Sequence, residues 1–243
     1  MCTVTFIPAG GNFFFTSNRD EQAGRQLADF PVVHEVKGQR LLFPKDPQGG
    51  GTWIGAHESG HIGVLLNGAD FVHQPMTPYL KSRGLILLDL ISNERPVRTF
   101  ENADFNQIEP FTAILFENKK LYSCKWNGSK KGIVSHNELE PRIWSSVTLY
   151  DPISICKRES WFKKWITENP GPSAEQIIRF HLEGGNGDPF NDLLMNREGK
   201  LFTNSISSIR VSDDSASFHY QDLRRGTSCQ SLISFQKRIF QKA

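Results

Sequence analysis

Two β-rich runs separated by a tight turn open the chain, and this hairpin pattern constrains the fold more than any other feature. Thr3–Pro8 and Phe13–Ser17 are rich in strand-forming side chains, and residues 9–12 between them read Ala-Gly-Gly-Asn. Turn-forming residues between two such runs predict a β-hairpin. The free ends of a hairpin lie side by side, so Cys2 is expected next to the Asn18–Glu21 segment that follows the second strand.

The rest of the chain repeats this alternation of hairpins and helices. Further strands are predicted for residues 52–56, 61–66, 111–117, 121–126 and three short runs within 205–235. Helices are predicted for residues 83–92 and 152–167 and from the N-cap Ser173 onward, whereas residues 22–50, rich in Pro and Gly, read as loop. Strands that come as hairpins form antiparallel sheets, so the predicted class is α+β, as a single domain over residues 1–243.

Charge and composition exclude several classes of function. The 28 Lys and Arg residues nearly balance 26 Asp and Glu residues, which argues against a nucleic-acid-binding protein. The longest apolar stretch, residues 84–88, is far too short to span a membrane, and no secretory signal is seen. No CxxC pair occurs, so we expect reduced thiols in a cytoplasmic protein without a metal site; the four cysteines are Cys2, Cys124, Cys156 and Cys229.

A cysteine directly after the initiator methionine has a chemical consequence. Removal of Met1 would give Cys2 a free α-amine beside its own thiol. The amine has a pKa of about 8, close to the value of about 8.5 for a thiol. It can therefore act as the general base for the same residue, as in other N-terminal nucleophiles. Such a cysteine attacks amide, ester or thioester carbonyls.

Four motifs, in this order, resemble the NRDE family, the family of the transport and Golgi organisation protein two. They are Cys2-Thr3-Val4, Thr16-Ser17-Asn18-Arg19-Asp20-Glu21, Asp46 followed by Gly49-Gly50-Gly51-Thr52-Trp53-Ile54-Gly55, and Ser82-Arg83-Gly84 at the start of a predicted helix. The resemblance is dense over the first third of the chain and continues in layout to the C-terminus.

This family is similar to the N-terminal-nucleophile hydrolases of the choloylglycine hydrolase and penicillin V acylase group. The resemblance implies a four-layer αββα sandwich, in which two mainly antiparallel sheets pack face to face between two helix layers. It also implies a nucleophilic first cysteine, an Arg and an Asp at the end of the second strand, an oxyanion Asn, a second Asn and a late Arg.

Carried over to this chain, the resemblance implies that Cys2 is the nucleophile, that Asp20 orients its amine and that Asn67 serves the oxyanion. Arg19 supplies positive charge, although the hydrolases carry their Arg three residues before the Asp, where this chain has Ser17. Further candidates for ligand contact are Asn18, His73, Ser146 at the place of the second Asn, and Arg210 at the place of the late Arg.

The predicted function is that of an N-terminal-cysteine amidohydrolase or acyltransferase. It would act on a small-molecule amide or acyl bond and require no cofactor. The alternative is a non-catalytic carrier of haem or an acyl-coenzyme A in the same cleft, because the family has been connected with both. His73 is the leading haem ligand under that alternative, since it follows Asn67 closely. A third reading is a protein–protein adaptor on an inert relic of the fold. Nothing in the sequence specifies an oligomeric state.

Overall fold

The computed structural model describes residues 2–75 and 78–236, apart from the side chain of Cys2, and this part of the chain forms two antiparallel sheets and four helices. In sheet A the order is β10–β1–β2–β12–β13–β14, with β11 paired to β12. Its strands are β1 (Cys2–Ala9), β2 (Asn12–Gln22), β10 (Arg142–Ser145), β11 (Asn196–Arg197), β12 (Leu201–Val211), β13 (Ser215–Asp222) and β14 (Thr227–Ser234).

Sheet B follows the chain order from β3 to β9. Its strands are β3 (Val32–Val36), β4 (Gln39–Phe43), β5 (Ile54–His57), β6 (Ile62–Asn67), β7 (Phe111–Glu117), β8 (Lys120–Trp126) and β9 (Lys131–His136). The helices are α1 (Arg83–Ile91), α2 (Pro96–Asn102), α3 (Pro152–Glu168) and α4 (Ala174–Glu183).

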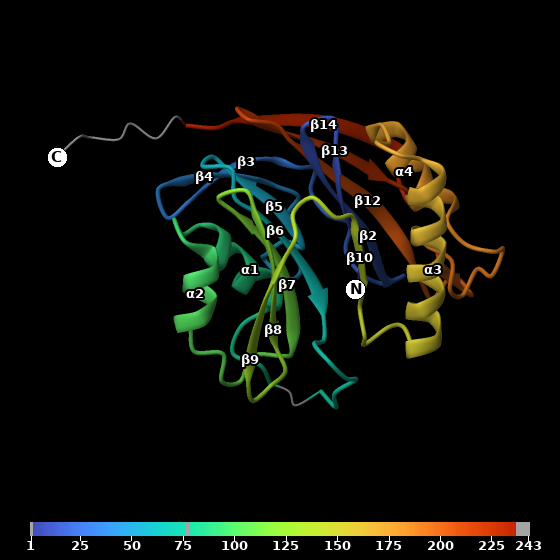
Figure 1. Cartoon of the computed structure of the whole chain (residues 1–243). Helices are drawn as coiled ribbons and strands as arrows, with labels where there is room; N and C mark the ends of the chain where they lie inside the picture. The colour runs from blue at the N-terminus through green and yellow to red at the C-terminus, as the bar shows by residue number, and fades with distance from the viewer. Residues whose placement is uncertain (1, 76–77, 237–243) are drawn as a thin grey trace.

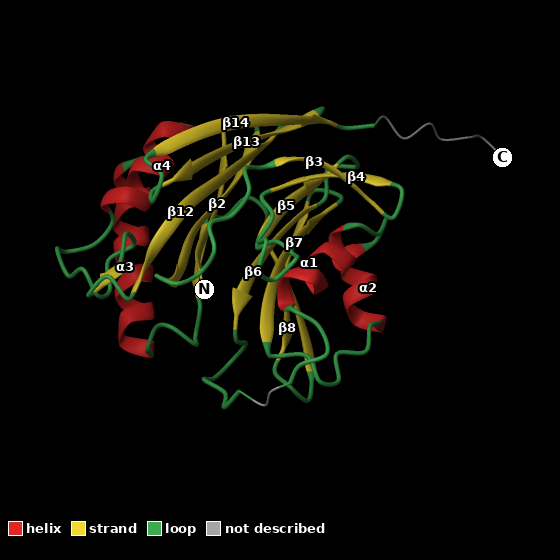
Figure 2. Cartoon of the chain, turned by 180° about the vertical axis from the view of Figure 1, so that it is seen from behind, coloured by secondary structure: helices red, strands yellow, loops and turns green. Residues whose placement is uncertain are grey.

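The layers confirm the predicted αββα sandwich. The two sheets pack face to face, with α1 and α2 on the outer side of sheet B and α3 and α4 on the outer side of sheet A (Figures 1 and 2). Aromatic rings join the sheets: Phe15 of β2 lies 5.4 Å from Phe116 of β7, measured between ring centroids. Both rings are almost completely buried, so this contact belongs to the main core.

Most predicted hairpins and helices are present. The Ser173 hydroxyl and the Gln176 side chain form a reciprocal capping box at the start of α4, as the sequence indicated. The prediction of loop for residues 22–50 is wrong, because β3 and β4 form the outer hairpin of sheet B there. No helix in the described ranges is long and apolar enough to cross a membrane.

The second strand also runs further than predicted, and this changes the geometry of the Asn18–Glu21 motif. These residues lie within β2 rather than beyond it, so their side chains alternate between the two faces of sheet A. Asn18 and Asp20 face the layer of α3 and α4, whereas Arg19 and Glu21 line a cleft on the opposite face.

Candidate active site

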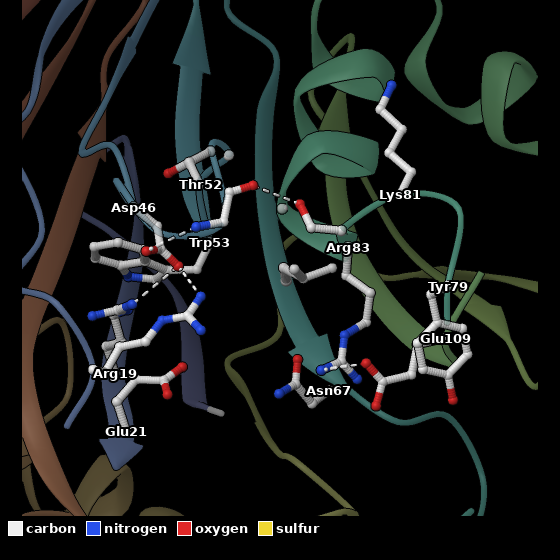
Figure 3. Close-up of a pocket in the computed structure, with 16 residues that line it drawn as sticks. Arg19, Glu21, Asp46, Thr52, Trp53, Asn67, Tyr79, Lys81, Arg83 and Glu109 are labelled. Atoms are coloured by element: carbon white, nitrogen blue, oxygen red, sulfur yellow. Dashed lines mark hydrogen bonds and ion pairs between the residues drawn. The ribbon is translucent and has the colours of Figure 1, made fainter. Parts of the chain in front are cut away.

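A cleft of about 460 Å³ opens between the edges of the two sheets, beside the start of α1 (Figure 3). One wall is formed mainly by the end of β2 and the Gly-rich loop before β5; the other is formed by the end of β6, the start of α1 and the residues before β7. The principal lining side chains are Arg19, Glu21, Arg25, Asp46, Trp53, Asn67, Tyr79, Lys81, Arg83 and Glu109.

Arg19 is the central cation of the first wall. It is only 3% exposed, and its guanidinium carbon lies 4.4 Å from the ring centroid of Trp53. A nitrogen of Arg19 lies 3.3 Å from a carboxylate oxygen of Asp46, which also pairs with Arg25. Stacking on an indole and pairing with a carboxylate both suit the planar guanidinium, so this side chain is fixed in direction.

The Gly-rich motif holds Asp46 in this position. The Asp46 N–H donates to the carbonyl of Gly51, and the N–H of Gly50 donates back to the carbonyl of Asp46, both at 2.8 Å. The Asp46 carboxylate additionally accepts from the N–H groups of Gln48 and Gly49. These hydrogen bonds close the loop on Asp46, its first residue, so that the loop presents the Asp46 carboxylate to Arg19.

The same loop carries the N-terminus of α1. The Ser82 side chain caps the helix by accepting from Leu85 N–H, and it donates to the Gly49 carbonyl at 2.9 Å. Gly51 and Gly84 cross at backbone contact, where a Cβ atom on Gly51 would lie 2.2 Å from the carbonyl carbon of Gly84. The Gly-Gly-Gly-Thr-Trp and Ser-Arg-Gly motifs thus form one joint that fixes both walls of the cleft.

The second wall is organised around Glu109. Its carboxylate pairs with Arg83 at 2.9 Å and lies 3.2 Å from Nε2 of His73. Asn67, at the end of β6, lines the cleft beside them. Ser146 donates its hydroxyl proton to the Asn67 carbonyl oxygen at 2.7 Å, so the structure brings this predicted residue next to Asn67.

Glu21 is an acid in a predominantly cationic surrounding. Burial raises the pKa of its carboxyl, but the nearby positive charges, including those of Arg19 and Arg25, outweigh this and hold the pKa below its usual value. Glu21 is therefore ionised at neutral pH.

Cys2 is placed here by its backbone. It is the first residue of β1, and its Cα pairs with that of Arg19 across the β1–β2 ladder. The predicted hairpin therefore brings Cys2 beside the cation that lines the cleft; its side chain lies outside the described part of the structure.

Asp20, predicted to orient the Cys2 amine, lies on the other face of the same strand and does not line the cleft. Its carboxylate accepts hydrogen bonds from the Tyr150 and Thr203 hydroxyls, both at 2.7 Å. Burial raises the pKa of Asp20, and the nearby charge of Arg158 and the two hydrogen bonds only partly offset this. Arg158, itself fully buried, stacks on the Tyr150 ring and donates to the Thr3 hydroxyl, which ties β1 to the helix layer.

Two other candidates lie away from the cleft. Asn18 donates to the carbonyl oxygens of His181 and Leu193 and accepts from the His181 ring, so its amide is used in packing α4 onto β2. Arg210 pairs in register with Phe14, five residues before Arg19 on β2, or about 17 Å at a rise of about 3.3 Å per residue. Its assignment as the late Arg of this cleft is therefore corrected.

Several lining residues were not predicted as site residues. Glu21 belongs to the Asn-Arg-Asp-Glu motif and Trp53 to the Gly-Gly-Gly-Thr-Trp motif, and strand alternation places Glu21 on the same face as Arg19. Glu109 has no local signature, because it reaches the cleft only through the β6–β7 pairing that sets Asn67 opposite Phe111. Within the described ranges, no group of three or more His, Cys, Asp or Glu side chains is arranged to hold a metal ion.

Two comparisons identify proteins to which this chain is similar, one with models of protein families and one with solved structures. The family model described as Transport and Golgi organisation 2 matches residues 1–239. The chain belongs to this family. No sequence among the curated proteins matches the chain.

Solved structures of two hydrolases share the fold of this chain. The C2A mutant of the conjugated bile acid hydrolase from Clostridium perfringens superposes with a TM-score of 0.61 at 11% identity, covering 98% of this chain and 97% of that one. The Caenorhabditis elegans orthologue of N-acylethanolamine-hydrolyzing acid amidase gives 0.59 at 11% identity, covering 86% and 92%.

Proposed function

We propose that the protein is an N-terminal-cysteine hydrolase that cleaves a C–N amide or thioester bond in the Arg19–Asn67 cleft. The observation that carries this proposal is the register of the first hairpin, which pairs Cys2 with Arg19 at the edge of that cleft. Similarity of fold to a bile acid hydrolase and an acid amidase supports the same class of reaction.

The proposed reaction begins once Met1 has been removed. The Cys2 sulfur bonds to the substrate carbonyl carbon, and the thiol proton passes to the α-amine of the same residue. As the C–N or C–S bond breaks, that proton moves to the leaving nitrogen or sulfur. Water then attacks the acyl-enzyme carbonyl and gives one proton to the α-amine. As the bond between the acyl carbon and the Cys2 sulfur breaks, the amine passes this proton to the sulfur, and a carboxylic acid is released.

Two lining residues have proposed roles in this reaction. A fixed guanidinium near the thiol favours its thiolate, which is the role assigned to Arg19. The Asn67 side-chain amide donates a hydrogen bond to the substrate carbonyl oxygen and so stabilises the negative charge that develops on it. Asp20 supports β2 from the helix side, through Tyr150 and Thr203.

The proposed cellular site is the cytoplasm. The support for this proposal is cysteine usage: the four cysteines are scattered along the sequence without a CxxC pair, which is typical of proteins in a reducing compartment.

The experiment combines mass and activity. Intact mass would establish whether Met1 is removed, and the protein would then be assayed against a panel of N-acyl amides and acyl thioesters. We expect hydrolysis by the wild type, none by Cys2→Ala, and unchanged hydrolysis by Cys156→Ala, which alters an exposed cysteine on α3. Full activity in Cys2→Ala, or in protein that retains Met1, would contradict the proposal.

A further inference from the structure

A second groove lies on the outer face of sheet A, on the side of that sheet away from the cleft. It has a volume of about 500 Å³. Its floor consists of two rows of side chains that cross β12, β13 and β14. The register places Arg210, Ser217 and Leu232 in one row and Ser208, His219 and Gln230 in the next.

The wall of the groove is the first part of α4, which covers β2 and β12 on this face (Figure 1). Ala174, Glu175 and Ile178 of this helix line the groove. Phe14, buried beside Arg210 on the neighbouring strand β2, and Leu232, 59% exposed on β14, add apolar surface. The groove therefore combines an apolar base and sides with a few charged groups, which is the usual composition of a small-molecule site.

The charges are arranged on opposite sides. Glu175 projects from the helix and Arg210 from the sheet; His219 also lies on the sheet side, but burial lowers its pKa, so its ring is neutral at neutral pH. They are near enough for both sheet residues to lower the pKa of Glu175, after the larger effect of hydrogen bonds from the backbone and from Ser173. Among the described residues, however, no hydrogen bond or ion pair joins Glu175 to Arg210 or His219. The Glu175 carboxylate and the Arg210 guanidinium thus lie on opposite sides of the groove and are not joined by a direct contact that would block it.

We propose that this groove binds the zwitterion of an α-amino acid with an apolar side chain. Arg210 takes the carboxylate as a two-pronged donor, and Glu175 takes the ammonium group. The side chain lies against Ile178 and Leu232. Such a ligand forms an ion pair with each of the two charged side chains, whereas a simple anion would be repelled by Glu175 and a simple amine by Arg210. This site is independent of the proposed hydrolase activity.

The test is a titration of ¹⁵N-labelled protein followed by NMR, with L-leucine as the probe. We expect saturable shifts of the Ser217 and Gln230 amides within about 20 mM, because charge pairs at an exposed groove give millimolar affinity. Two analogues each lack one charge: 4-methylpentanoate lacks the ammonium, and 3-methylbutylamine lacks the carboxylate. Each is expected to bind about tenfold more weakly, as is leucine to Arg210→Gln or Glu175→Gln.

Matched controls lie on the same helix. Arg179→Gln and Glu183→Gln remove the same charges from positions of α4 that do not line the groove, and they should leave leucine binding unchanged. Absence of saturable shifts with leucine would overturn the proposal. So would equal binding of 4-methylpentanoate, which would mark a simple anion site. Equal loss of binding in Arg179→Gln and Arg210→Gln would also overturn it.

Discussion

Gly51 and Gly84 approach so closely that neither has room for a side chain. A Cβ atom on Gly51 would lie 2.2 Å from the Gly84 carbonyl carbon, and one on Gly84 would lie 2.9 Å from the Thr52 carbonyl oxygen. The loop that presents Asp46 and the helix that presents Arg83 are thereby joined at one point. The width of the cleft depends on this crossing.

Gly51→Ala is expected to force the loop and α1 apart. Overpacking against backbone cannot be relieved by a side-chain rotation, so the free energy of unfolding should fall by about 2 kcal/mol. Urea unfolding measures this. Gly132→Ala is the control, because a Cβ there meets nothing within 4 Å, and it should change stability by less than about 0.5 kcal/mol. Equal stability of the two variants would contradict the close crossing.

Asp20 should make stability depend on pH in an unusual direction. Its pKa is raised in the folded state, so folding disfavours its ionisation. The stability it contributes is fully present below the unfolded pKa of about 4 and is lost as pH rises through the folded pKa. Relative to Asp20→Asn, the wild type should therefore lose stability as pH rises from about 4 toward neutrality.

Asp214→Asn supplies the opposite control for this pH series. Hydrogen bonds from Ser212 and Ser215 lower the pKa of Asp214. The free energy of unfolding of the wild type, relative to that of Asp214→Asn, should therefore increase as pH rises. Urea unfolding at several pH values would show the two trends, and the same sign for both would refute the assignment for Asp20.

His181 should stay neutral far into the acid range. Burial and, to a smaller extent, the charge of Arg158 lower its pKa to about 3. Its Nδ1 lies 2.6 Å from Asn18 Oδ1, to which it donates, and its Nε2 lies 2.8 Å from the Thr5 hydroxyl, from which the neutral ring can accept. Because the unfolded ring has a pKa of about 6.5, stability falls as pH drops from there toward about 3. NMR titration of the ring protons checks this; titration near pH 6.5 would disprove it.

Asn67→Ala tests the oxyanion role within the proposed reaction. Loss of one oxyanion donor typically lowers kcat by about 100-fold or more, and we expect KM to change little. Ser146→Ala removes the hydrogen bonds of its hydroxyl to the Asn67 backbone and to the Thr148 hydroxyl but leaves the Asn67 amide in place, so it should cost about 1 kcal/mol of stability and reduce kcat less. An Asn67→Ala variant with unchanged kcat would remove this residue from the mechanism.

The sequence predicted the elements with strong local signals. These signals depend on residues close together in the sequence, so they can be recognised without knowledge of the fold. They are the turn at Gly10–Gly11, the N-cap Ser173 and the apolar periodicity of α1. β3 is not predicted from the sequence because it is an edge strand: in the described part of the chain it pairs with β4 alone, and Val32 remains 50% exposed. Its strand conformation is determined by that pairing rather than by burial of an alternating face.

The site was predicted in part for a similar reason. The resemblance placed Arg19 and Asn67, and the structure brings both into one cleft. The resemblance also implies Asp20, and the predicted end of the second strand at Ser17 groups Asn18 and Asp20 with Arg19. Because β2 continues to Gln22, the alternation of faces instead separates Asn18 and Asp20 from Arg19. Glu109 depends on a pairing between distant strands, which no local pattern encodes.

Because side chains alternate along β2, the hairpin turn at Gly10–Gly11 determines which residues at the far end of the strand face the cleft. A shift of one residue between β1 and β2 would exchange the faces, carrying Arg19 and Glu21 under the helices and Asn18 and Asp20 into the cleft. The length of the turn at Gly10–Gly11 therefore determines which face of sheet A each residue of the Asn18–Glu21 motif occupies. Inserting or deleting one residue in this turn would remove Arg19 and Glu21 from the cleft without any change in the motif itself.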